Sequence, residues 1–115
     1  SALNRVEDHR EAEDAATKLI NLFPGQEIGF VELGNALMSQ GKNEEAYNAM
    51  RYGMNTINGS LGIAVQYGLA CRRAGHVEEA QNMAEQLRRA LGEKAADIEG
   101  ALKEMETGTD GSALV

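Results

Sequence analysis

Residues 31–48 read VELGNALMSQGKNEEAYN, and residues 65–82 repeat this pattern as VQYGLACRRAGHVEEAQN. Eight aligned positions are identical, and six of these eight hold glycine, alanine or glutamate. The offset between the two stretches matches a period of about 34 residues, which is typical of stacked helical hairpins. The sequence therefore predicts an array of helix pairs, and this repeat decides the fold.

Apolar residues recur at helical spacing within the repeated unit. Phe30, Leu33 and Leu37 lie three or four residues apart, and the same spacing resumes at Ala46 after Gly41. Such spacing places the side chains on one face of a helix. The expected fold class is all-α, with short turns that make neighbouring helices antiparallel.

Residues that end helices divide the chain into parts. Pro24 disfavours helical backbone at the residue before it, so a first helix is expected over 10–22. Asn43 and Ser60 are expected to cap the N-termini of the helices that follow them. Residues 1–9 either extend the first helix or are the remnant of an earlier one. The expected parts are an N-terminal half repeat or capping helix over 1–25, repeats over 26–59 and 60–93, a C-terminal capping helix over 94–106, and a flexible tail over 107–115.

Small residues mark the places where helices are expected to cross closely. These are Gly34 and Gly68 in the first helix of each pair, and Ala46 and Ala80 in the second. A glycine inside a helix costs roughly 1 kcal/mol relative to alanine, so a tight crossing must return at least that much in packing. The alternative is that the glycines mark loops, but the apolar spacing continues through them.

The unit resembles the tetratricopeptide repeat over about residues 10–94. The first copy matches the family pattern at Phe30, Leu33, Gly34, Leu37, Gly41 and Ala46. The second copy matches at Gly68, Gly75 and Ala80 and departs from it at Ala64, Tyr67 and Cys71. The resemblance implies a right-handed superhelix of antiparallel helix pairs, an α-solenoid whose concave groove binds proteins.

The resemblance also implies which side chains line that groove. They are Ile28, Val31, Asn35, Met38, Val65, Gln66, Leu69, Arg72 and Arg73. The amides of Asn35 and Gln66 would hold an extended peptide backbone, and Arg72 and Arg73 would meet a carboxylate. The alternative for the two arginines is a solvated helix C-terminus, where cations interact favourably with the helix dipole. Val31 stands where chaperone-adaptor members of the family carry a lysine, so their clamp for a terminal carboxylate is not expected here.

Composition excludes several classes of function. The 115 residues include 11 basic and 18 acidic side chains, for a formal charge of −7, which opposes binding to nucleic acid or to anionic membranes. A single cysteine forms no internal disulfide. The sequence has no apolar run of about 18 residues to span a membrane and no stretch typical of a signal peptide. Localisation stays open, with the cytoplasm favoured.

Few residues offer catalytic chemistry. His9 has no second histidine or cysteine nearby, and His76 is expected to be exposed because it follows the turn at Gly75. Cys71 lies on the apolar stripe and is expected to be a small buried hydrophobe. The methionines are expected to fill the core. The sequence predicts no enzyme, no cofactor and no metal site.

The expected function is therefore a scaffold or adaptor that binds a partner protein or peptide, with a carboxylate to meet the arginines. One alternative is a self-assembly module that stacks through its end faces, at Ala12, Ala16 and Leu19 or at Ile98 and Leu102. The other is a regulatory segment of a larger multidomain protein.

Overall fold

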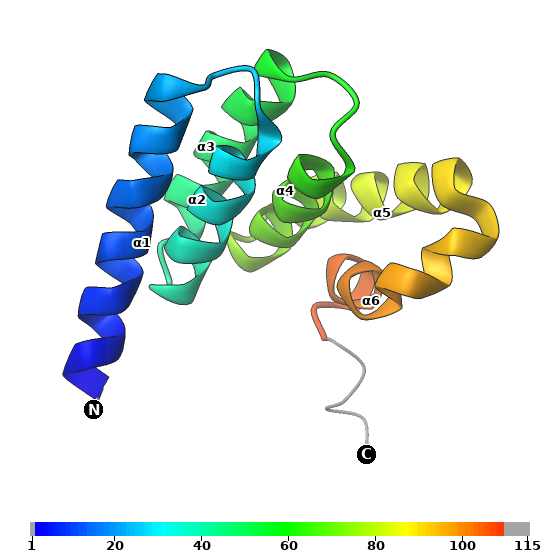
Figure 1. The fold of residues 1–115 in the computed structure, drawn as a ribbon. Helices are drawn as coiled ribbons and strands as arrows, with labels where there is room; N and C mark the ends of the chain where they lie inside the picture. Colours follow the sequence, from blue (N-terminus) through cyan, green and yellow to red (C-terminus); the bar gives the residue numbers. More distant parts are fainter. Residues whose placement is uncertain (1, 110–115) are drawn as a thin grey trace.

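The chain is all-helical in a computed structural model that describes residues 2–109, with side chains from residue 8 onward. Figure 1 shows the helices in chain order, from α1 at one edge to α6 near the C-terminal end. The elements are α1 (Ala2–Leu22), α2 (Glu27–Ser39), α3 (Asn43–Thr56), α4 (Leu61–Arg73), α5 (Val77–Leu91), a 3-10 helix (Gly92–Ile98) and α6 (Glu99–Thr107). The predicted all-α class is confirmed, and the described residues contain no strand.

The two predicted hairpins share the geometry of their turns. The N–H of Gly41 donates to the carbonyl of Met38 at 3.0 Å, and the N–H of Gly75 donates to the carbonyl of Arg72 at 3.2 Å. Both glycines have positive φ angles, 76° and 90°, in the region that favours a residue without a Cβ. In the aligned stretches Gly75 is the counterpart of Gly41, and Arg72 is the counterpart of Met38. The repeat read from the sequence is therefore also a repeat of backbone geometry.

Helices that follow one another in the chain pack together, and α4 also contacts α2 on one side and α6 on the other. These three helices form what we call the α2–α4–α6 row. Figure 1 shows α2 and α4 side by side, with α6 near the C-terminal end of the chain. The row contains the first helix of each predicted pair, which is where the binding residues were expected.

Gly34 and Gly68 lie where helices of the row meet. A Cβ added at Gly34 would lie 3.1 Å from Met50 Sδ and 3.3 Å from Gln66 Cβ, and one added at Gly68 would lie 2.5 Å from Met105 Sδ. Both glycines therefore permit close helix contacts, as predicted. Gly34 lies beside Gln66, and Gly68 and Gly100 are the counterparts of these two residues in the next copy. A third copy of the repeat would therefore place Gly100 beside Gly68. Met105 lies there instead, so α6 meets α4 in a register that the repeat does not predict.

The core is built mainly from alanine, leucine and methionine. Ala46 and Ala80 are fully buried, as expected for close crossings, and Cys71 is buried with them. A second, smaller cluster joins Phe30 to Met50 and Ile63. Of the five methionines, the four at 38, 50, 83 and 105 are buried and Met54 is half-buried, which confirms their expected role as core filler.

The structure decides one open boundary and changes another. The first helix begins at Ala2, so residues 2–9 extend it, which is one of the two alternatives left open by the sequence; they include good helix formers and no glycine or proline. The capping helix expected over 94–106 is a 3-10 helix followed by α6. Gly92, with φ of 58°, interrupts α5 there, and short 3-10 turns are common connectors. The expected tail lies outside the described residues from 110 onward.

The two predicted caps have different outcomes. Ser60 caps α4, because its Oγ accepts a hydrogen bond from the N–H of Ile63 at 3.1 Å. Asn43 is the first residue of α3 rather than its cap; Lys42 stands at the N-cap without a side-chain bond. The tight turn at Gly41 brings the chain into the helix one residue earlier than the capping pattern indicated.

None of the described helices is both long enough and apolar enough to cross a membrane. Within the same residues, no group of three or more histidine, cysteine or carboxylate side chains is placed to hold a metal ion.

Candidate binding surfaces

The structure divides the predicted groove residues by exposure. Ile28, Asn35 and Arg73 are exposed, and Met38 and Gln66 are buried. The half-buried members are Val31, Val65, Leu69 and Arg72. Met38 and Gln66 each expose only 8% of their surface, so they contribute to packing between helices and little to an open surface.

Asn35 and Gln66 are brought together rather than left free. The Nε2 group of Gln66 donates to Asn35 Oδ1 at 2.6 Å and to the carbonyl of Val31 at 3.4 Å. The bond joins α2 to α4 and occupies the carbonyl side of the exposed Asn35 amide. The Nδ2 group of Asn35 therefore remains the part of this pair that can donate to a partner.

The two arginines at the end of α4 lie in different surroundings. Arg73 forms a two-pronged ion pair with Glu104 of α6, with Nε–Oε2 at 2.6 Å and Nη2–Oε1 at 3.0 Å. Hydrogen bonding to Glu104 raises the pKa of Arg73. Arg72 is half-buried against the backbone of Gly108. Arg73 is thus already paired within the chain, whereas Arg72 takes part in no ion pair among the described side chains.

A polar cluster that the sequence did not predict joins α3, α4 and α5 around Glu79. The hydroxyls of Tyr47 and Tyr67 donate to Glu79 Oε2 at 2.8 and 2.6 Å. These bonds, that from Tyr67 first, hold the pKa of Glu79 below its usual value. Burial, with the bond to Glu79, raises the pKa of Tyr67. Burial also raises the pKa of Cys71 to about 11, so this thiol stays neutral at pH 7.

His76 belongs to the edge of this cluster and is half-buried, so it is less exposed than expected. Its ring stacks on Tyr47 with the centroids 3.8 Å apart, and its Nε2 lies 3.0 Å from Glu44 Oε2. The side chain is 31% exposed. Its place after the turn glycine suggested solvent, but the ring turns back over the preceding hairpin. Only the position of Tyr47 in three dimensions reveals this contact.

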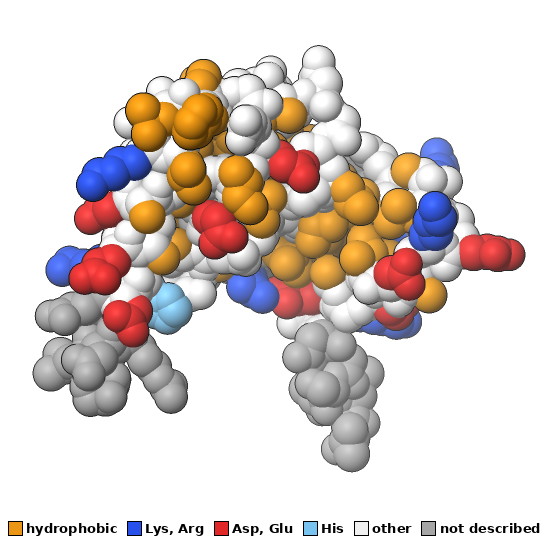
Figure 2. Space-filling model, viewed as in Figure 1, with side chains coloured by type: hydrophobic (Ala, Val, Ile, Leu, Met, Phe, Trp, Pro, Cys, Tyr) orange, Lys and Arg blue, Asp and Glu red, His pale blue; other side chains and the backbone are white. Residues whose placement is uncertain are grey.

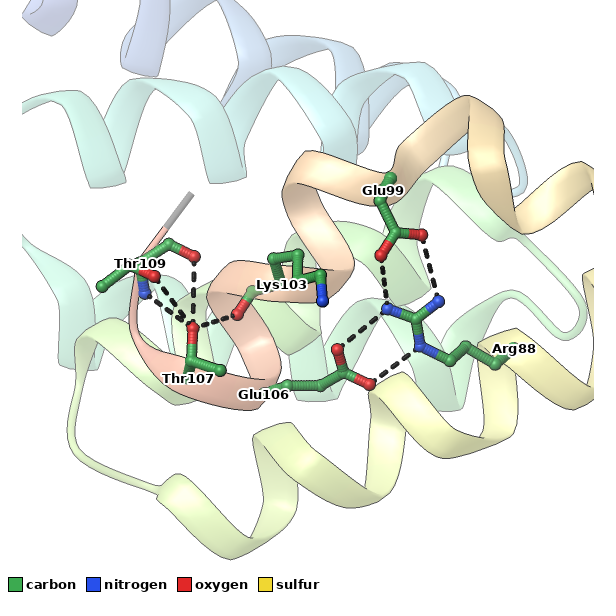
Figure 3. Close-up of polar contacts among 6 residues, drawn as sticks. All are labelled: Arg88, Glu99, Lys103, Glu106, Thr107 and Thr109. Atoms are coloured by element: carbon green, nitrogen blue, oxygen red, sulfur yellow. Dashed lines mark hydrogen bonds and ion pairs between the residues drawn. The ribbon is translucent and has the colours of Figure 1, made fainter. Parts of the chain in front are cut away.

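A second ionic cluster fixes α6 to α5 and is drawn in Figure 3. Arg88 is bonded through its Nε and Nη2 groups to Glu106, at 2.8 and 2.9 Å, and through Nη1 and Nη2 to Glu99, at 3.0 and 2.8 Å. Glu99 begins α6 and Glu106 lies in its last turn. One guanidinium thus holds both ends of a short helix, in the paired geometry that favours arginine over lysine.

These ion pairs predict an acid-sensitive attachment of α6. Hydrogen bonds from Arg88 lower the pKa values of Glu99 and Glu106 below the ordinary 4.5. Their stabilisation is therefore fully present above about pH 4.5 and is lost as the pH falls through the lowered values. Replacing Arg88 with methionine should flatten the fall in the free energy of unfolding between about pH 5 and 2, measured by urea denaturation at each pH. An unchanged slope would contradict the role of these pairs.

A cleft lies on the other side of the row, between α3 and α5, with α4 behind it; we call it the outer cleft. Its polar part encloses about 380 Å³, and its apolar part about 470 Å³. Met54, Met83 and Gln86 line both parts, which makes the cleft continuous. This cleft was not predicted, because the binding residues were expected on the first helix of each pair.

Hydrophobic side chains are also exposed outside the predicted groove. Figure 2 shows them gathered near the connection between α1 and α2, and again in the region of α4, α5 and the 3-10 helix. At the first of these places Leu22 is 70% exposed, Phe23 51% and Ile28 49%. Ile28 therefore continues an apolar area that reaches beyond the α2–α4–α6 row.

The end faces expected for self-assembly are partly covered within the chain. Ala16 is buried, Leu19 is half-buried, and Leu102 is fully buried. Helix α1 packs on α2, and α6 packs on both α4 and α5. Ala12 is exposed and Ile98 is half-buried, so the expectation was wrong for Ala16 and Leu102, which are buried within the chain.

The comparisons with known proteins identify no relative. No family model, curated protein or solved structure matches the chain. The functional assignment therefore depends on the residues and their geometry.

Proposed function

We propose that the chain is a non-enzymatic scaffold, similar to the tetratricopeptide repeat, that binds a segment of a partner protein along the α2–α4–α6 row. The observation that carries the proposal is the helical hairpin that recurs in both sequence and turn geometry. Arrays of such hairpins stack their first helices side by side and present an extended surface. In this proposal the helices continue as a right-handed superhelix.

The exposed part of the row supplies apolar contacts and one oriented amide. Ile28, Val31, Val65 and Leu69 keep part of their surface accessible, and the bond from Gln66 turns the amide of Asn35 so that it donates. An extended segment carries unpaired backbone carbonyls that need such donors when they lose water. Gln66 acts here as a positioning residue, and Met38 as packing beneath the surface.

A carboxylate on the partner would bind at Arg72. Arg73 is unsuited to this role because Glu104 already holds it. Reversing the charge of Arg73 would place two carboxylates together and disturb α6, so a loss of binding by such a variant would not identify the surface.

A charge inserted beside Gln66 tests the surface more cleanly. The purified chain, its Asn35→Arg variant and its Asn48→Arg variant are used as bait for a cell extract, and captured proteins are quantified by mass spectrometry. Asn48 is exposed on α3, outside the row, so it provides a matched control. We expect the wild type and Asn48→Arg to retain the same proteins and Asn35→Arg to lose them. Equal capture by all three would contradict binding along the row.

A further inference from the structure

We propose that the outer cleft is a second binding surface, which takes an extended segment carrying an acidic side chain and, two to four residues away, a large aliphatic side chain. The cleft is formed mainly by α3 and α5, the second helices of the two pairs. Helix α4 lines it only through Leu61, Ala64 and Tyr67, none of which is a predicted groove residue. Binding at the outer cleft is therefore independent of the proposed function. An experiment can disprove binding at one surface without disproving binding at the other.

The polar part of the cleft offers one cation that forms no ion pair among the described side chains, although the Glu79 carboxylate lies within range of its charge. Arg51 and Glu79 are the charged residues that line this part. Glu79 accepts hydrogen bonds from Tyr47 and Tyr67, so its charge is held by the protein. Arg51 lies over the ring of Tyr47, 5.4 Å from its centroid, and takes part in none of the ion pairs among the described side chains. A guanidinium that forms no ion pair within the chain favours a carboxylate on the bound segment.

Three exposed amides favour an extended backbone over a helix. Asn55 of α3 and Asn82 and Gln86 of α5 line the polar part, and all three are exposed. Each amide can donate and accept at once. A helix has already paired its backbone groups, but an extended segment needs such partners when it loses water. Asn82 and Gln86 lie one helical turn apart, about 6 Å, close to the roughly 6.7 Å between alternate residues of an extended chain.

The apolar part of the cleft takes the aliphatic side chain. It is lined by Ile57, Leu61, Ala64, Leu87, Ala90 and Leu91. Leu61 is 45% exposed, so this lining is open to solvent. Ile57 follows Arg51 by six residues, about 9 Å along a helix, which an extended segment covers in about three residues. Met54 and Met83 join the two parts, and their flexible side chains suit a surface that adapts to a ligand.

Peptide selection tests this inference directly. A phage-displayed library of random linear peptides is selected against the full chain, and the recovered peptides are synthesised and titrated by fluorescence polarisation. We expect enrichment of Asp or Glu followed two to four residues later by Leu, Ile or Met. Binding should weaken about tenfold in Arg51→Glu, since charge-assisted hydrogen bonds contribute about 1.5 kcal/mol or more. It should also weaken in Ala90→Glu, which puts a charge in the apolar part.

Two controls make the result specific. Lys18→Glu makes the same charge change on α1, at an exposed side chain outside the cleft, and should bind like the wild type. A peptide with lysine in place of its acidic residue should bind Arg51→Glu better than it binds the wild type. In spectra of methyl-labelled methionine, the peptide should shift Met54 and Met83 and leave the buried Met105 unchanged.

The other outcomes would overturn the inference. Recovery of no binding peptide would do so, as would peptides whose binding ignores both Arg51→Glu and Ala90→Glu. Peptides lost in Asn35→Arg but not in Arg51→Glu would support binding along the α2–α4–α6 row and exclude the outer cleft.

Discussion

Replacing Phe30 with alanine is expected to lower the free energy of unfolding by about 3–5 kcal/mol, the usual cost of removing a fully buried aromatic ring. Phe30 exposes only 1% of its surface and packs with Met50 and Ile63. A Cβ added at Gly53 would lie 2.8 Å from its ring, so the ring fills the space between α2 and α3 closely. Urea denaturation followed by circular dichroism measures the change.

Tyr52 provides the matched control for this variant. Its ring contacts that of Phe30 with the centroids 6.0 Å apart, but its side chain lies at the surface and the residue is 63% exposed. Tyr52→Ala should therefore cost much less than Phe30→Ala. Similar losses from the two variants would mean that Phe30 is not at the centre of the first hairpin.

The second large effect is expected where α6 meets α4. Leucine in place of Gly68 should lower the free energy of unfolding by about 1–3 kcal/mol, the typical cost of overfilling a packed site. Its Cβ would lie 2.5 Å from Met105 Sδ and 2.7 Å from Met105 Cε. Met105 is fully buried, so any movement of its thioether takes place inside the packed core. The gain in helix propensity over glycine is smaller than this cost.

The same substitution at Gly100 separates the steric effect of leucine from its effect on helix propensity. It lies in α6, and a Cβ there would have no neighbour within 4 Å. Gly100→Leu should raise stability by up to about 1 kcal/mol, because leucine favours the helix. The contact between α4 and α6 would be refuted by a Gly68→Leu variant that is as stable as Gly100→Leu.

The sequence predicts the repeated features of this fold better than the unique ones. The turns at Gly41 and Gly75 and the close contacts at Gly34 and Gly68 follow from a period that two copies share. A glycine that occurs at the same position in both copies is a stronger indication of a turn or a close contact than a glycine that occurs once. Nothing repeats at Gly92, and the 3-10 helix there was missed because a single glycine does not show how the chain continues.

The candidate site was predicted less well for a physical reason. Helical periodicity shows that Gln66 and Met38 lie on the same face as exposed residues, but it does not show how closely the next helix approaches. The approach of α4 to α2 buries Gln66, and the ion pair of Arg73 depends on the register of α6. The contacts of His76 and Arg88 join residues that no sequence pattern connects.

The most direct test of the central claim is whether both glycines of the row meet the methionines assigned to them. Nuclear Overhauser effects are measured between the Cα protons of Gly34 and the methyl group of Met50, and between those of Gly68 and the methyl group of Met105. The packing of α3 on α2 predicts the first signal, and the packing of α6 on α4 predicts the second. The absence of either signal from the folded chain would contradict the helix packing on which the proposed binding surfaces depend.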